Sequence, residues 1–159
     1  TREEFATLGI HDETMWVHRW VIEPLLYVQD MIIEKGYGIV IKDAFRPRGL
    51  YRLIGEKREA LGLPISLFNF DDTPHATGMA VDVVLVDGNG DCPWMRDDSD
   101  GDGCHAVDFY RPFKDPVRIE YQRLQDILVL SMLKAGFWLA SKREYWHWQL
   151  YDADSAPCF

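Results

Sequence analysis

Residues 73–86 read Thr-Pro-His-Ala-Thr-Gly-Met-Ala-Val-Asp-Val-Val-Leu-Val. The valine-rich second half, residues 79–86, predicts a strand because β-branched side chains suit a pleated sheet. Asp82 lies inside this strand, where an unpaired carboxylate among valines would be costly. His75 lies in the loop that enters the strand, and Gly78 gives the backbone the freedom to turn between them. We therefore expect the side chains of His75 and Asp82 to converge on a shared partner.

Hydrophobic periodicity on both sides of this strand predicts an α+β fold. We expect helices packed on a mainly antiparallel central sheet, with an Asp-Gly-Asn-Gly-Asp turn directly after the strand. The first expected helix has Pro24 in its first turn and apolar residues at 25, 28, 31 and 32, and it stops at Gly36. A buried strand is expected at 39–42, followed by a helix at 50–61 closed by Gly62. The last expected elements are a helix at 119–132 capped by Gly136 and closing strands at 137–141 and 144–151.

Composition limits the domain organisation and the partners. With 159 residues and 47% hydrophobic composition, the chain predicts a single domain, residues 1–159. A net charge of −9 disfavours binding to nucleic acid, because phosphate backbones are themselves negative. No apolar run approaches the roughly 20 residues that span a bilayer, and Arg2, Glu3 and Glu4 argue against a signal peptide in the given sequence. We expect no membrane insertion, and the sequence leaves the compartment open.

The chain contains three cysteines, Cys92, Cys104 and Cys158. Cys92 and Cys104 flank one polar loop, so a disulfide that closes the loop and two separate thiols are equally compatible with the sequence. A structural zinc site is disfavoured because no Cys-x-x-Cys pair is present.

A second motif near the C-terminus, Glu144-Tyr-Trp-His147, supplies two further residues of the metal-ligand type. Two histidines and one carboxylate commonly hold a catalytic zinc ion, because three protein ligands leave the fourth tetrahedral position open. His75, Asp82 and His147 are the predicted ligands, and Glu144 is then free to act as a base. Side chains alternate along a strand, so this prediction requires a bend at residues 145–146 or a position for Glu144 in the preceding turn.

A third stretch, Asp43-Ala-Phe-Arg-Pro47, places Arg46 at the end of a strand, because Pro47 disfavours helix at the residue before it. Each candidate also has a purely structural interpretation, although their joint occurrence favours a metal site. In that interpretation His75 is a surface or hydrogen-bonded histidine, Asp82 bonds backbone amides, Glu144 pairs with Lys142 or Arg143, Arg46 is tied to Asp43, and Trp146 and Trp148 are packing residues.

Together these motifs resemble the D-alanyl-D-alanine metallopeptidases, a family that includes D-Ala-D-Ala dipeptidases of the VanX type. Residues 73–82 are similar to the family's Ser-x-His-x-x-Gly-x-Ala-x-Asp signature, with Thr73 in the place of the serine. Residues 144–147 resemble its Glu-x-Trp-His motif, and residues 43–47 resemble the Asp-x-Tyr-Arg-Pro stretch of its dipeptidase branch. The three motifs occur in the family's order across about 105 residues.

The resemblance implies a fold of the hedgehog/D-Ala-D-Ala-peptidase type and a role for each matching residue. Zinc would be held by His75, Asp82 and His147, with Glu144 as the catalytic base. Arg46 would stabilise the negative charge that develops in the transition state. It also implies a bacterial cytoplasm, periplasm or cell envelope as the location, without choosing among them.

An acidic loop follows the central strand and departs from the family pattern. In the dipeptidases an acidic residue beyond the zinc-ligand strand helps to hold the free amino group of the substrate, and the candidates here are Asp97, Asp98, Asp100 and Asp102. Residues 98–103 also fit the start of an EF-hand calcium loop. The twelfth position, however, is Phe109 rather than glutamate. A solvated acidic loop is therefore favoured over a calcium site.

The leading hypothesis is a zinc-dependent dipeptidase that hydrolyses a D,D-dipeptide related to peptidoglycan precursors. One alternative is a D,D-carboxypeptidase or an L-alanyl-D-glutamate endopeptidase that acts on longer stem peptides. Another is a metal-bearing binding module without activity. The presence of Glu144 and Arg46 argues against the binding module, because binding alone needs neither a base nor a partner for an oxyanion.

Overall fold

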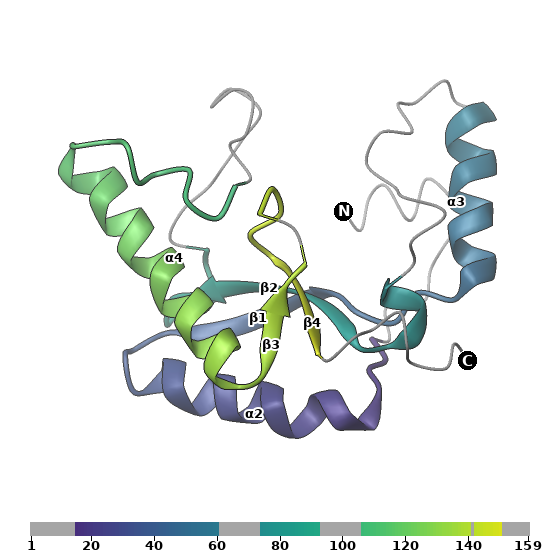
Figure 1. Cartoon of the computed structure of the whole chain (residues 1–159), viewed down its shortest axis with the longest axis horizontal. Coiled ribbons are helices and arrows are strands. Elements are labelled where there is room, and N and C mark those ends of the chain that lie inside the picture. The colour runs from purple at the N-terminus through teal and green to yellow at the C-terminus, as the bar shows by residue number, and fades with distance from the viewer. Residues whose placement is uncertain (1–14, 61–73, 93–105, 141, 151–159) are drawn as a thin grey trace.

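The structure, a computed structural model, describes residues 15–60, 74–92, 106–140 and 142–150. Figure 1 shows helices around one central antiparallel sheet whose strand order is β1-β2-β4-β3, so the predicted α+β class is confirmed. The described elements, in chain order, are α2 (Arg19–Ile33), β1 (Gly38–Asp43), α3 (Arg48–Ala60), η1 (Pro74–Thr77), β2 (Ala80–Val86), α4 (Pro116–Lys134), β3 (Phe137–Leu139) and β4 (His147–Leu150).

Strand β2 is central because it pairs with β1 on one side and with β4 on the other. It begins one residue after the predicted start, at Ala80. The turn that follows forms as predicted: the Asp87 carboxylate accepts hydrogen bonds from the backbone N–H groups of Asn89 and Asp91. Hydrogen bonding to Asn89 and then to Asp91 is the main reason that the pKa of Asp87 lies below its usual range.

The prediction of a buried strand at residues 39–42 is wrong about burial. Strand β1 forms there, but it lies at the edge of the sheet, its residues are half-buried or exposed, and Val40 is 43% exposed. A β-branched run is compatible with both settings, because β-propensity reflects the fit to a pleated surface rather than depth.

The first described helix, α2, differs from the prediction at its start. It begins at Arg19, after His18 caps it by accepting a hydrogen bond from the backbone N–H of Trp20, so Pro24 lies inside the helix rather than in its first turn. Proline there lacks the N–H that would bond the carbonyl of Trp20. The helix nevertheless continues, because its buried apolar stripe starts well before the proline and ends near the last turn. The stripe consists of Val21, Leu25, Val28 and Ile32.

The last helix, α4, and the two strands after it follow the prediction more closely. Asp115 caps α4, and Gly136 follows the helix with φ of 90°, a conformation that suits glycine. Strand β3 ends at Leu139, and β4 begins only at His147, three residues after the predicted start, because residues 142–146 form a turn. Of the predicted helix at 50–61, α3 covers Arg48–Ala60, while residues 61 and 62 lie outside the described part.

Helices α2 and α4 contact each other and both contact the sheet, so they cover the same face of it, whereas α3 stands at the opposite end of the molecule from α4 (Figure 1). Alternate residues of β2, Val81, Val83 and Leu85, are fully buried in the apolar core, as is Trp148 of β4. Side chains alternate along a strand, so Asp82 and His147, each adjacent to one of these core residues, face away from the helices.

None of the helices described is long and apolar enough to cross a membrane. Cys104, Cys158, the Asp98–Gly103 calcium candidate and all four aspartates proposed for the substrate amine lie outside the described residues, so these predictions remain predictions. Phe109 is described, and its ring packs against the rings of Tyr110 and Phe113.

Candidate metal centre

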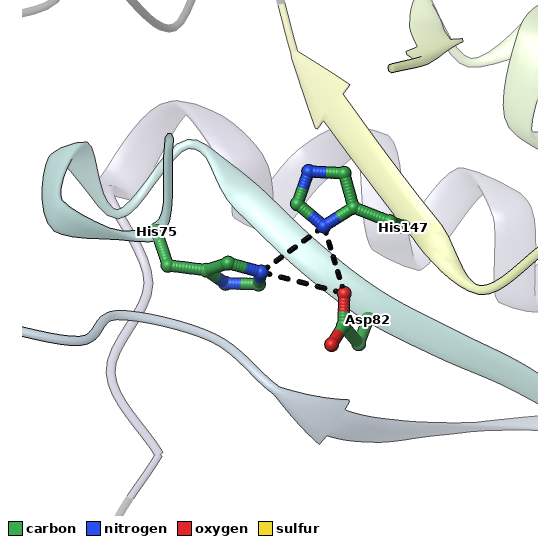
Figure 2. Close-up of side chains that lie close together, drawn as sticks. All are labelled: His75, Asp82 and His147. Atoms are coloured by element: carbon green, nitrogen blue, oxygen red, sulfur yellow. Dashed lines mark hydrogen bonds and ion pairs between the residues drawn. The ribbon is translucent and has the colours of Figure 1, made fainter. Parts of the chain in front are cut away.

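Three predicted ligand residues meet at one point on the sheet face that is turned away from α2 and α4. Figure 2 shows His75 entering from η1, Asp82 from β2 and His147 from β4, with helix ribbon behind the strands. His75 Nε2 lies 3.1 Å from His147 Nδ1 and 3.4 Å from Asp82 Oδ1, and His147 Nδ1 lies 3.0 Å from Asp82 Oδ1. The fold thus brings His75 and His147, which are 72 residues apart in the sequence, into contact.

Sheet register explains why Asp82 and His147 meet. They are direct partners in the antiparallel pairing of β2 with β4, so their side chains leave the sheet on the same face. The same register makes Asp43 of β1 the other neighbour of Asp82, after an irregularity in β1 between Ile41 and Asp43. Three polar residues from neighbouring strands therefore lie in one row across the sheet.

A tight turn brings His75 to this row. Thr77 Oγ1 donates a hydrogen bond to the carbonyl of Pro74 and accepts one from the backbone N–H of Met79. Gly78 has a φ of +70°, and a Cβ on it would lie 3.0 Å from the backbone nitrogen of His18, so the turn needs glycine. The predicted role of Gly78 in turning the chain between His75 and Asp82 is confirmed.

The orientation of the His75 ring is fixed by a hydrogen bond at Nδ1, on the side away from Asp82 and His147. Its Nδ1 lies 2.7 Å from the carbonyl oxygen of Ala44, which can only accept a hydrogen bond, so Nδ1 carries the proton. In the neutral ring the lone pair is then on Nε2, the atom that faces Asp82 and His147. This carbonyl–histidine contact is the usual way in which a protein orients a metal-binding imidazole.

The other ring, that of His147, is held by Gln149. The Gln149 amide nitrogen lies 3.1 Å from His147 Nε2, which leaves Nδ1 facing the cluster. The sequence reasoning missed both Ala44 and Gln149. The position of Gln149, two residues beyond His147 on a strand, places it on the same face and offered a signal. Ala44 offered none, because it acts through a backbone carbonyl 31 residues away from His75.

Charge and burial suit a cation at this point. His75 and His147 are buried, and the side chain of Asp82 is 16% exposed. Burial alone would raise the pKa of Asp82, but hydrogen bonding with His147 and the interaction with His75 outweigh it, so the pKa lies well below its usual range. Asp82 is therefore a carboxylate at neutral pH, the state that metal binding requires.

The spacing of the three ligand atoms also fits a small divalent ion. Ligands on a tetrahedral zinc ion with bonds of about 2.0–2.1 Å lie about 3.3 Å apart, close to the separations of 3.0–3.4 Å found here. His75, Asp82 and His147 thus form a group that could hold a metal ion. Three protein ligands on a tetrahedral ion would leave the fourth position open. The donor atoms alone do not choose between zinc and other metals that accept nitrogen and oxygen ligands.

The predicted base lies next to this group in the sequence. Glu144 belongs to the turn before β4, and its carbonyl accepts a hydrogen bond of 3.1 Å from the backbone N–H of His147. This is one of the two arrangements that the spacing of Glu144 and His147 required. Trp146 and Trp148 pack against or within the core, as expected.

The fifth candidate, Arg46, lies three residues beyond the end of β1 and is tied to the turn of His75. Its backbone N–H donates a 3.0 Å hydrogen bond to the carbonyl of His75. The guanidinium forms an ion pair with Asp43, and its central carbon lies 4.8 Å from the centre of the Tyr51 ring. The ion pair with Asp43 is the contact that the structural interpretation of Arg46 expects, so its role in a transition state stays a prediction.

Comparison with known proteins gives no independent family assignment, because neither the family models nor the curated proteins searched match the chain. The resemblance to the D-alanyl-D-alanine metallopeptidases therefore rests on the three motifs.

Proposed function

We propose that the chain is a zinc-dependent dipeptidase that hydrolyses D-Ala-D-Ala or a closely related D,D-dipeptide. The observation that carries the proposal is the meeting of His75 Nε2, Asp82 Oδ1 and His147 Nδ1 within 3.4 Å of one another, with Glu144 in the turn directly before His147. Of the metals that could fit, zinc is favoured by the two imidazoles and one carboxylate with an open position. The substrate class follows from the motif resemblance.

The proposed mechanism assigns one task to each residue. When bound, a zinc ion supplies the Lewis acidity that makes an attacking water acidic near neutral pH. Glu144 accepts the proton of that water and returns it to the leaving amine, as a general base and then a general acid. Asp82 and the two histidines would hold the zinc ion.

Arg46 has the electrophilic role in this mechanism. As water attacks the peptide carbonyl, negative charge develops on the carbonyl oxygen, and a nearby guanidinium binds this state more tightly than the ground state. The ion pair with Asp43 and the contact with Tyr51 restrict the rotation of the Arg46 side chain, which is 11% exposed. Loss of a donor of this kind typically costs on the order of 100-fold or more in rate.

A substrate panel tests the proposal. Zinc-loaded protein is incubated with D-Ala-D-Ala, N-acetyl-D-Ala-D-Ala, L-Ala-L-Ala and a muropeptide, and the products are identified by mass spectrometry. We expect cleavage of the free D,D-dipeptide alone. The Glu144→Ala protein, purified in the same way, controls for a contaminating peptidase.

The other outcomes point to the alternatives. Cleavage of only the blocked dipeptide or the muropeptide would replace the dipeptidase with a D,D-carboxypeptidase or an L-alanyl-D-glutamate endopeptidase, and the fragment masses identify which bond is cut. Zinc binding with no turnover of any of these peptides would favour a metal-bearing binding module. Failure of the wild-type protein to bind zinc would overturn the proposal altogether.

A further inference from the structure

Gln149 is a buried polar residue for which the motifs give no role. It lies in β4, two residues after His147, and only 5% of its surface is exposed. Its amide nitrogen lies 3.1 Å from Nε2 of His147, on the side of the ring away from the metal-ligand group. A buried amide beside a ligand histidine can hydrogen-bond the ring nitrogen that faces it, and so hold the ring in place.

The protons of the metal-free group can be assigned from the contacts. His75 carries its proton on Nδ1, where it bonds Ala44, so its Nε2 is an acceptor. His147 Nδ1 lies 3.0 Å from Asp82 Oδ1 and 3.1 Å from His75 Nε2, both of which are acceptors. Nδ1 of His147 therefore carries a proton that it donates to them. Nε2 of the neutral ring is left as an acceptor, and it receives a hydrogen bond from the Gln149 amide.

Metal binding would reverse this pattern at His147. A metal ion at Nδ1 would take the place of the proton there, that proton would leave to solvent, and the ring would stay neutral by taking up one proton on Nε2. The new Nε2–H would then face the amide N–H₂ of Gln149, and two donors cannot bond each other. A half-turn of the amide about its last bond replaces the nitrogen with the oxygen, which accepts from Nε2–H without a change in side-chain shape.

We propose that Gln149 is the positioning residue for His147, and that its amide reverses when the metal binds. The inference rests on the proposed metal site. Glutamine suits this position because its amide satisfies His147 in both states, as a donor without the metal and as an acceptor with it. A carboxylate in the same place could only accept, so it would favour the metal-bound state, in which Nε2 carries the proton.

Zinc affinity, measured by competition with a chromophoric chelator, tests the positioning role. Gln149→Met keeps the approximate volume and removes the polar group, and we expect zinc to bind about 10–100-fold more weakly, the range typical of lost partners behind a ligand. Gln149→Glu leaves only an acceptor, so it should bind zinc more tightly than wild type. Gln122→Met is the matched control, because it removes another buried amide that lies in α4. This amide donates hydrogen bonds to the carbonyl of Val107 and to the carboxylate of Asp126, so its loss should leave zinc affinity unchanged.

Nitrogen NMR of the imidazole rings provides a second readout that a merely structural role would not change. In wild type, zinc should move the proton of His147 from Nδ1 to Nε2, while His75 keeps its proton on Nδ1. The same His147 tautomer with and without zinc, or equal zinc affinity of wild type and both Gln149 variants, would overturn the inference.

These results separate the inference from the proposed function. If the wild-type protein binds no zinc, the metal site itself fails. If wild type binds zinc and the Gln149 variants match it, only the role of Gln149 fails. Should Gln149→Met not fold, as judged by circular dichroism, Gln149→Glu and the wild-type NMR experiment still decide the question.

Discussion

Where strands β2 and β4 pair, two neighbouring residue pairs on opposite faces of the sheet differ in chemistry although they share one backbone. Val81 and Trp148 are register partners, face α2 and α4, and are fully buried. The next pair in the register, Asp82 and His147, faces the other way and is polar. Two consecutive register pairs therefore belong to the apolar core and to the candidate metal centre, because side chains alternate between the two faces of a sheet.

The two faces are also stabilised in different ways. Burial of an apolar side chain contributes about 1.5–3 kcal/mol by removing its surface from water. Burial of a carboxylate costs free energy unless charge and hydrogen bonds offset the cost, as the two histidines do for Asp82. We therefore expect substitutions on the helix-covered face to change stability, and substitutions of the polar residues on the other face to change metal binding and chemistry.

The largest effect is expected from His147→Ala. The variant loses one of three ligands. Loss of a residue that only hydrogen-bonds a ligand typically weakens metal binding by up to about 100-fold, so zinc affinity should fall further here. Turnover should disappear with it. Chelator competition measures the affinity, and circular dichroism checks that the fold persists. Wild-type zinc affinity in this variant would show that His147 is not a ligand, and the proposed metal site on this face would be wrong.

Glu144→Ala separates metal binding from chemistry within the polar region. Glu144 is not needed as a ligand, so the variant should retain zinc, while loss of a general base should lower kcat by about 10²–10⁴-fold. Zinc content and turnover of D-Ala-D-Ala are measured on the same sample. Turnover equal to wild type would remove Glu144 from its assigned role.

Trp148→Ala tests the helix-covered face. Trp148 is fully buried between β4 and the helices, and replacement of such a residue with alanine typically costs about 3–5 kcal/mol of unfolding free energy. Urea denaturation measures this cost, and the remaining folded protein should still bind zinc. Trp138→Ala is the matched control, because Trp138 lies on the neighbouring strand with 44% of its surface exposed. Equal costs at the two positions would contradict the assignment of the core to that face.

Much of this organisation could be predicted from local sequence. The valine run gives β2, Gly136 marks the end of α4, and the spacing in residues 73–82 gives the turn that joins His75 to Asp82. The prediction of three ligand residues needed only residue types and motif order. The strand, the helix end and the turn each depend on neighbours within about ten positions, where periodicity and turn chemistry are informative.

Features set by contacts distant in sequence could not be predicted in this way. The edge position of β1 depends on which strands pair, and an apolar run looks the same at an edge and in the centre. The helical continuation through Pro24 depends on the apolar stripe that begins at Val21 and packs on the sheet. The Ala44 carbonyl behind His75 has no side-chain signature at all.

The smallest of the expected effects, at Gly78, connects the two faces. An alanine there would have to adopt a φ of +70° and place its Cβ 3.0 Å from the backbone nitrogen of His18, the residue that caps α2. The left-handed conformation alone costs about 1–2 kcal/mol for a residue with a Cβ, so Gly78→Ala should lower the unfolding free energy by at least this amount. Zinc binding should weaken as well, because the same turn carries His75.

A matched glycine makes the test of Gly78 specific. Gly88 lies in the turn after β2, where an added Cβ meets nothing within 4 Å, so Gly88→Ala should change stability by no more than about 0.5 kcal/mol. Urea denaturation and chelator competition on both variants give the comparison. A Gly78→Ala protein as stable as Gly88→Ala would show that the turn relaxes freely, and His75 would then not depend on glycine for its place beside Asp82.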